Sequence, residues 1–172
     1  MNRPQRRPKP LSALIAPPQE VSVATLRIAL PLLPSATLAK NRQVGQPWQV
    51  LYQRRLRERN ILGWQLIKAA REQGFNISAG MKPLFNKATL VIHLHFRDRR
   101  ARDWDGLYAR CSVLLDMLCA PKANRQTGWP ILTDDDTQHL VSYRVVPHMG
   151  SELGPMTVIT IRESSDEDLN TV

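Results

Sequence analysis

The sequence contains few cysteines and no long apolar run, and each shortage excludes a class of protein. The 172 residues include only two cysteines, Cys111 and Cys119, both in one apolar segment. If that segment is a helix, a spacing of eight residues separates them by about 12 Å, which is too far for a disulfide. We therefore expect two core thiols in a reducing cytoplasm and not a disulfide-stabilised secreted domain.

Membrane association is not expected. No segment approaches the roughly 18 consecutive apolar residues of a transmembrane helix. The N-terminal region is basic, but it is rich in proline and lacks the apolar stretch of a signal peptide. These absences predict a cytoplasmic protein with no membrane partner.

Acidic residues are scarce relative to basic ones. The chain has 24 lysines and arginines against 15 aspartates and glutamates, a net charge of +9. This excess favours a polyanionic partner, most simply nucleic acid, although a basic and highly soluble surface is the alternative. A hydrophobic content of 42% is enough for one core, and the length fits one domain.

The ends of the chain differ in composition from its middle. Residues 1–20 are rich in proline and arginine, with no acid before Glu20. This pattern predicts a disordered basic arm that can touch phosphates, or sequence that is dispensable. Residues 164–172 form an acidic tail that we expect to be disordered. The domain itself is predicted to span residues 21–163.

Hydrophobic periodicity and turn residues predict an α/β (α+β) fold, a small mixed β-sheet packed against two main helices. The expected strands are residues 21–30, 87–96, 139–146 and 156–162, and the expected helices are 48–73 and 103–120. The first helix carries many arginines, which would track a DNA backbone or form a solvated face. We expect Leu107, Cys111, Leu114 and Leu118 to form the buried stripe of the second.

In the strand at 87–96, His93 and His95 are expected on the same face of the sheet. A zinc site would need further ligands, and the sequence nearby offers no cysteine or third histidine. We interpret this face as half-exposed.

The most informative segment, residues 97–105, combines four arginines with an Asp-x-Asp pair. Arginines attract a polyanion, whereas carboxylates repel one unless a divalent metal lies between them. A phosphodiester held by arginine beside a metal held by aspartate would explain both. A second acidic cluster, residues 134–136, follows about thirty residues later.

Simpler explanations exist for both clusters. Asp103 suits the N-cap of the second helix, and the helix dipole favours Asp105 in its first turn. Three adjacent acids usually mark a solvated turn. If both clusters lie at one edge of the sheet, however, two or three carboxylates converge there and would bind Mg²⁺.

Three segments resemble the RusA family of Holliday junction resolvases, which are crossover junction endodeoxyribonucleases. Residues 96–107, FRDRRARDWDGL, are similar to the family's basic run, Asp-x-Asp-Asn-Leu signature and helix. Residues 134–145, DDDTQHLVSYRV, resemble its Asp-Asp-x-Gln element and following strand. Residues 30–35, LPLLPS, are similar to its opening strand and Pro-Pro-Ser. The three occur in the family's order and cover residues 26–161.

The resemblance implies a homodimer that cuts four-way DNA junctions symmetrically with Mg²⁺, with Mn²⁺ as a substitute, and a bacterial or phage origin. By position, Asp103 and Asp105 carry over as metal ligands. The third ligand is Asp136 if the glutamines are aligned, and Thr137 if no gap is allowed; we prefer the carboxylate of Asp136. Asp135 is an alternative ligand.

The sequence departs from the family pattern at two positions beside the acidic pair. The family lysine, six residues after the first aspartate, is replaced by Ala109, and the usual asparagine by Gly106. Arg110 lies about 20° from Asp103 around a helix, so it could face the acidic site. Arginine stabilises negative charge but donates protons poorly.

The sequence therefore predicts a Mg²⁺-dependent endodeoxyribonuclease of recombination and repair. Asp103, Asp105 and Asp136 would position the metal, with Arg110 as a further catalytic group. The residues expected to hold DNA are Arg97, Arg99, Arg100, Arg102, Lys40 and Arg42. The alternatives are a DNA-binding protein of the same fold that has lost catalysis and a basic interaction module. A two-fold dimer would form through the half-exposed face of 87–96 or through Trp64 and Trp129.

Overall fold

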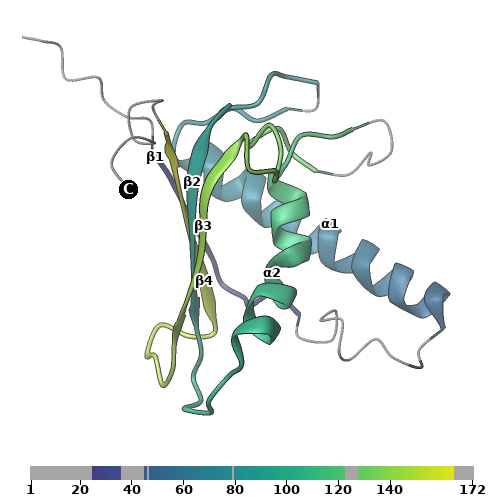
Figure 1. Cartoon of the computed structure of the whole chain (residues 1–172), viewed down its shortest axis with the longest axis vertical. Helices are drawn as coiled ribbons and strands as arrows, with labels where there is room; N and C mark the ends of the chain where they lie inside the picture. The colour runs from purple at the N-terminus through teal and green to yellow at the C-terminus, as the bar shows by residue number, and fades with distance from the viewer. Residues whose placement is uncertain (1–24, 36–44, 46, 79, 123–127, 165–172) are drawn as a thin grey trace, which may run out of the picture.

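The computed structural model describes residues 25–35, 45, 47–78, 80–122 and 128–164. Within them the chain forms β1 (Thr25–Leu30), α1 (Trp48–Glu72), β2 (Ala88–His95), α2 (Trp104–Leu118), β3 (Leu140–His148) and β4 (Met156–Glu163). The four strands form one mixed sheet, and both helices lie on the same side of it (Figure 1). The predicted fold class is confirmed. The N-terminal arm lies outside the described residues.

The order of strands in the sheet is β1-β4-β2-β3. β4 pairs antiparallel with both of its neighbours, β1 and β2. β2 and β3 are parallel, and α2 is the crossover that connects them. Parallel neighbours need such a crossover, because the chain must return to the end of the sheet at which β2 began before it can start β3. β1 and β3 are therefore the edge strands.

The core lies between the sheet and the helices. Alternate residues of β2 are buried, as its sequence predicts, and Leu90, Ile92 and Leu94 are fully buried. The predicted stripe of α2 is buried as well, and both cysteines are buried free thiols. Burial raises the pKa of Cys111 to about 12, so this thiol is unreactive at neutral pH. The two cysteines are core residues, as expected.

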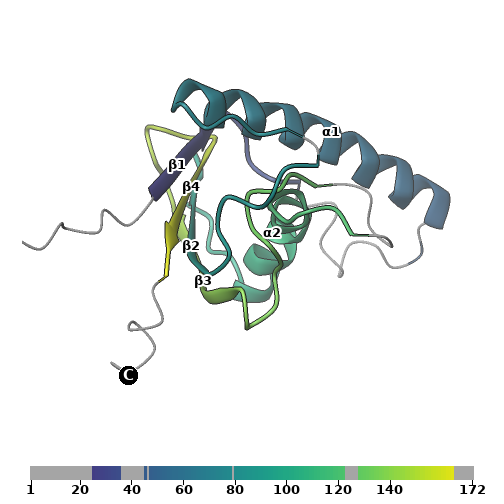
Figure 2. The same ribbon diagram turned by 90° about the horizontal axis from the view of Figure 1, so that it is seen from above.

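The side chains of the two halves of α1 differ in how far they are buried. All of its buried residues lie from Leu62 onward, whereas Trp48 and Tyr52 near its start are more than half exposed. The first half extends beyond the sheet and α2 (Figure 2). Leu51, an apolar residue in the same half, is only partly covered for this reason. The helix ends before Gly74, whose φ of 85° suits glycine.

The two helices touch closely at Gly63. A Cβ built at this residue would lie 2.9 Å from Cε of Met117 and 2.9 Å from Nε1 of Trp129. Glycine therefore permits α1 to pack against α2 and the loop that follows it. Trp129, expected as an interface residue, is partly buried in this contact, whereas Trp64, the next residue of α1, is 71% exposed.

Candidate metal centre and nucleic-acid interface

Asp103 and Asp105 lie at the N-terminal end of α2. Asp103 is the N-cap, as predicted, and its Oδ2 accepts a hydrogen bond of 2.6 Å from the backbone N–H of Gly106. A Cβ at residue 106 would lie 2.8–2.9 Å from the two carboxylate oxygens. Gly106, where the resembled family has asparagine, thus gives the Asp103 carboxylate room over the first turn. Asp105 is exposed in that turn.

The second acidic cluster lies in the connection from α2 to β3. Oδ1 of Asp136 accepts hydrogen bonds from the backbone N–H groups of Gln138 (3.0 Å) and His139 (3.1 Å). The same oxygen lies 2.7 Å from Nδ1 of His139, and this contact, more than any other, lowers the pKa of Asp136. Asp134 forms an ion pair with Lys122, which lowers the pKa of Asp134 to about 2. Both carboxylates are therefore ionised at neutral pH.

Two overlapping groups at this cluster could hold a cation. Ligand atoms of Asp134, Asp136 and His139 all lie within 4.8 Å of one another, and the same is true of Cys119, Asp134 and Asp135. The carboxylate oxygens suit Mg²⁺ or Mn²⁺, whereas the imidazole of His139 and the thiol of Cys119 would favour a softer transition metal. His139 is not among the ligands predicted from the sequence, although its position three residues after Asp136 is a usable signal.

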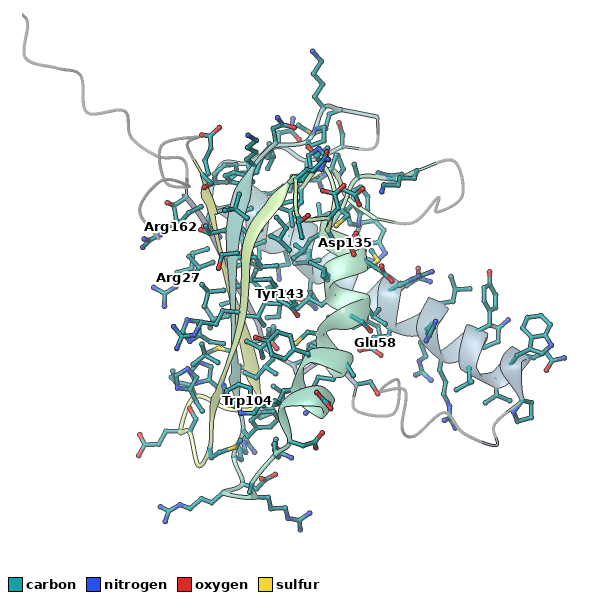
Figure 3. All side chains as sticks on the ribbon, in the orientation of Figure 1. Arg27, Glu58, Trp104, Asp135, Tyr143 and Arg162 are labelled. Carbon is teal, nitrogen blue, oxygen red and sulfur yellow. The ribbon has the colours of Figure 1, made fainter. Side chains whose placement is uncertain are left out.

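One chain does not bring the two acidic clusters together. Asp103 precedes α2, whereas Leu132, just before Asp134, pairs with Cys119 at the other end of that helix. Figure 3 shows Asp135 near the C-terminal end of α2 and Trp104 at its N-terminal end. The fifteen residues of α2 span roughly 22 Å.

The expectation that both clusters lie at one edge of the sheet is therefore not met within one chain. The physical reason is the parallel pairing of β2 and β3. Asp103 follows the end of β2 and Asp136 precedes the start of β3. The two residues therefore lie at opposite ends of these parallel strands. Asp103, Asp105 and Asp136 do not form one intrachain site.

The four arginines of the loop after β2 divide into two pairs. Arg97 and Arg102 are engaged within the chain. Nε of Arg97 donates to the backbone carbonyl of Gly154 (2.7 Å), and Arg102 donates to both carboxylate oxygens of Asp98 (2.8 Å each) while its guanidinium covers the ring of Phe96. These contacts fix the loop.

Arg99 and Arg100 form the second pair, and both side chains are exposed. The backbone N–H of Arg100 donates to Oδ1 of Asp98, so the same carboxylate that holds Arg102 also shapes the loop around this pair. Arg99 and Arg100 are thus presented to solvent next to the N-terminal end of α2. Lys40 and Arg42, which were also expected to hold DNA, lie outside the described residues.

The side chain of Arg110 contacts other parts of the chain. Its Nε donates to the backbone carbonyl of Pro34 (2.8 Å), and its guanidinium lies 5.2 Å from the centre of the Phe96 ring. Its charge also lowers the pKa of Glu58 on α1, which burial raises more strongly. These contacts connect α2 to α1 and to the segment after β1, a packing role.

Comparison of the sequence with protein-family models and with curated proteins finds no match. The family resemblance therefore depends on the three motifs themselves. In the part of the chain that the structure describes, no helix has both the length and the apolar character needed to cross a membrane.

Proposed function

We propose that this chain is a Mg²⁺-dependent endodeoxyribonuclease that acts on four-way DNA junctions as a two-fold dimer. One observation carries the proposal. A chain of net charge +9 places an exposed Asp pair at one end of α2 and a carboxylate–imidazole cluster at the other. Neither group is a complete site for phosphodiester hydrolysis, but a two-fold axis can join them.

The geometry of α2 suggests how the two groups meet. Trp104, Tyr108 and Ser112 form an exposed stripe along this helix, and β3 beside it is an edge strand. A two-fold axis perpendicular to α2 near its midpoint would pack two such stripes antiparallel. Asp103 and Asp105 of one protomer would then lie beside the 134–139 cluster of the other. Such an isologous interface forms two identical sites.

Each residue then has a defined role in cutting. When bound, the metal would lower the pKa of a water molecule and offset the charge that develops on the phosphate. The carboxylates of Asp103, Asp105 and Asp136 would hold it. The exposed Arg99 and Arg100 would bind phosphates of the same strand next to the cut. Two sites related by the dimer axis would make the paired cuts that resolve a junction.

A second function is favoured by a specific observation. Asp103 already accepts a hydrogen bond from the backbone N–H of Gly106, and Asp136 accepts one from that of Gln138. Ala109 stands where the resembled family has lysine. Carboxylates in this state serve a structural role without any metal. The corresponding function is a junction-binding protein that does not cut.

The test uses a labelled four-way junction with and without Mg²⁺, together with two variants. Asp103→Asn and Asp136→Asn should each abolish cutting and leave junction binding intact or tighter, because a repulsive charge is lost. Asparagine also caps helices well, so α2 should remain folded. Glu72→Gln, which removes an exposed carboxylate on α1, is the control and should cut like the wild type.

Mixing the two inactive variants tests the composite site. A heterodimer of Asp103→Asn and Asp136→Asn has one site with both defects and one intact site, so the mixture should regain nicking of one strand. A mixture that stays inactive, or a strict monomer by light scattering with and without junction DNA, would contradict the dimeric site. If the wild-type protein binds the junction but shows no Mg²⁺-dependent cutting, the result would support the second function, a junction-binding protein that does not cut.

A further inference from the structure

The face of the sheet turned away from the helices is open and carries no acidic residue on its strands. Paired residues across the sheet share a face, so the registers define this surface. We call it the open face. Its residues are Thr25, Arg27 and Ala29 of β1, Met156, Val158, Thr160 and Arg162 of β4, Thr89, Val91, His93 and His95 of β2, and Ser142, Arg144, Val146 and His148 of β3.

Three exposed arginines set the charge of the open face. Arg27 and Arg144 lie in one row across the sheet, because Arg27 pairs with Thr160, Thr160 with Val91 and Val91 with Arg144. Three interstrand spacings of about 4.8 Å separate them by roughly 14 Å. Arg162 lies one row away on β4, and Figure 3 shows Arg27 and Arg162 pointing away from the helices.

Three histidines occupy the other end of the same face. His93 and His95 point to this side, as predicted, and β3 adds His148. Nδ1 of His93 lies 2.9 Å from Nε2 of His148, and the rings of His95 and His148 stack with centres 4.4 Å apart. Nδ1 of His95 lies 2.9 Å from Oγ of Ser151. With Arg27, Arg162 and Thr160 they line a shallow cleft of about 420 Å³.

The histidines do not form a ready metal site. Among the described residues, their ligand atoms are not all within 4.8 Å of one another, unlike those of the acidic cluster. Instead, stacked imidazoles lie near arginines, and the described strand residues of this face include no acid. Burial and the nearby charges of His148, His95, Arg27 and Arg144 lower the pKa of His93. An anion on this face would relieve that repulsion.

Charge decides between the occupants of such a face. A second copy would bring the arginines of two open faces together, which costs energy. The roughly 14 Å between Arg27 and Arg144 is close to the width of the major groove of DNA, about 12 Å, so phosphates on both sides of one groove are within reach of the two guanidiniums. The hydroxyl of Thr160 lies in the row between them, and those of Thr89 and Ser142 lie in the next row; all three are further phosphate donors.

We propose that the open face is a second DNA-binding surface, which holds the backbone of a duplex arm on the side of the sheet opposite α2. The identity of this DNA as an arm of a four-way junction rests on the proposed function. Each protomer would then contact one arm through Arg99 and Arg100 near the acidic groups and another through Arg27, Arg144 and Arg162. A dimer would thereby hold all four arms.

The test is a salt titration of binding to a four-way junction and to a linear duplex, without Mg²⁺. The variant replaces Arg27, Arg144 and Arg162 with glutamine. These side chains are exposed, so the fold should persist, which an unchanged thermal unfolding curve would verify. If all three meet phosphates, the slope of log K against log salt should become shallower by about 2.7, since each contact contributes about 0.9.

A matched variant removes the same charge elsewhere. Lys68, Arg71 and Lys82 are exposed cations outside the open face, and their replacement by glutamine should change the slope much less. Equal losses in both variants would show that only net charge matters and would overturn the inference. So would wild-type binding by the open-face variant, or a change in its oligomeric state alone, which would indicate a contact between copies.

This experiment separates the inference from the proposed function. Binding is measured without the metal, so loss of the slope in the open-face variant supports the inference even if the wild-type protein never cuts DNA. Conversely, Mg²⁺-dependent cutting with an unchanged slope in this variant supports the nuclease and overturns the second surface.

Discussion

On the helix-covered side of the sheet, every second residue of β2 is fully buried, and the acidic groups lie at the two ends of α2. The open face has the same strands and no helix, and its charged strand residues are arginines. One sheet thus separates a packed side, with the candidate metal ligands at its margins, from a side that we propose contacts DNA. Stability and binding can therefore be perturbed separately.

The largest expected effect is a difference in stability between two variants, Leu90→Ala and Val91→Ala, which change adjacent residues on opposite faces of the sheet. Leu90→Ala removes a fully buried side chain from the core and should lower the free energy of unfolding by roughly 2–5 kcal/mol. Val91→Ala, on the open face, should cost less than about 1 kcal/mol. Urea unfolding of both variants measures the difference. Similar losses for the two would mean that the open face is covered.

An intermediate effect, on the salt dependence of DNA binding, is expected when two sets of arginines are neutralised together. Neutralising Arg99 and Arg100 should reduce the salt slope of DNA binding by about two. If the loop and the open face bind separate arms, adding this pair to the open-face variant should give the sum of the two reductions, because distant sites are usually additive. A combined reduction no larger than either alone would indicate a single shared surface.

The smallest effect concerns protonation on the open face. Because the pKa of His93 is lowered in the folded chain, the unfolded chain takes up this proton first as the pH falls below about 6.5. Folding stability should therefore fall as the pH decreases through this window. His93→Gln should reduce the fall, by less than about 1 kcal/mol because solvent screens this face. Chemical unfolding at pH 7 and pH 5 measures it, and an identical fall in both proteins would contradict it.

Local signals in the sequence predicted most of the fold. The alternation of β2 placed Leu90 and His93 on opposite faces, and Asp103 was identified as a helix cap from its position before an apolar stripe. These features depend on neighbours a few residues away. The resemblance to a nuclease family, by contrast, stays a prediction.

The arrangement of the site could not be predicted in the same way. Whether Asp136 lies near Asp103 depends on the direction of β3 relative to β2, which no local periodicity encodes. His148 joins His93 through pairing between strands 55 residues apart. The orientation of Arg110 was predicted from helix geometry alone. That geometry gives no information on the distant backbone carbonyl of Pro34, which accepts a hydrogen bond from the Arg110 side chain.

The uncovered first half of α1 has a consequence for how the chain opens. Helices of fewer than about 12–15 residues are marginal in water without tertiary contacts, and the half before Leu62 has no fully buried residue. Its amide hydrogens should exchange far sooner than those of the second half, which Gly63 holds against α2. Slower amide hydrogen exchange in the turns around Trp48 and Tyr52 would therefore reveal a molecule that binds to this half of the helix.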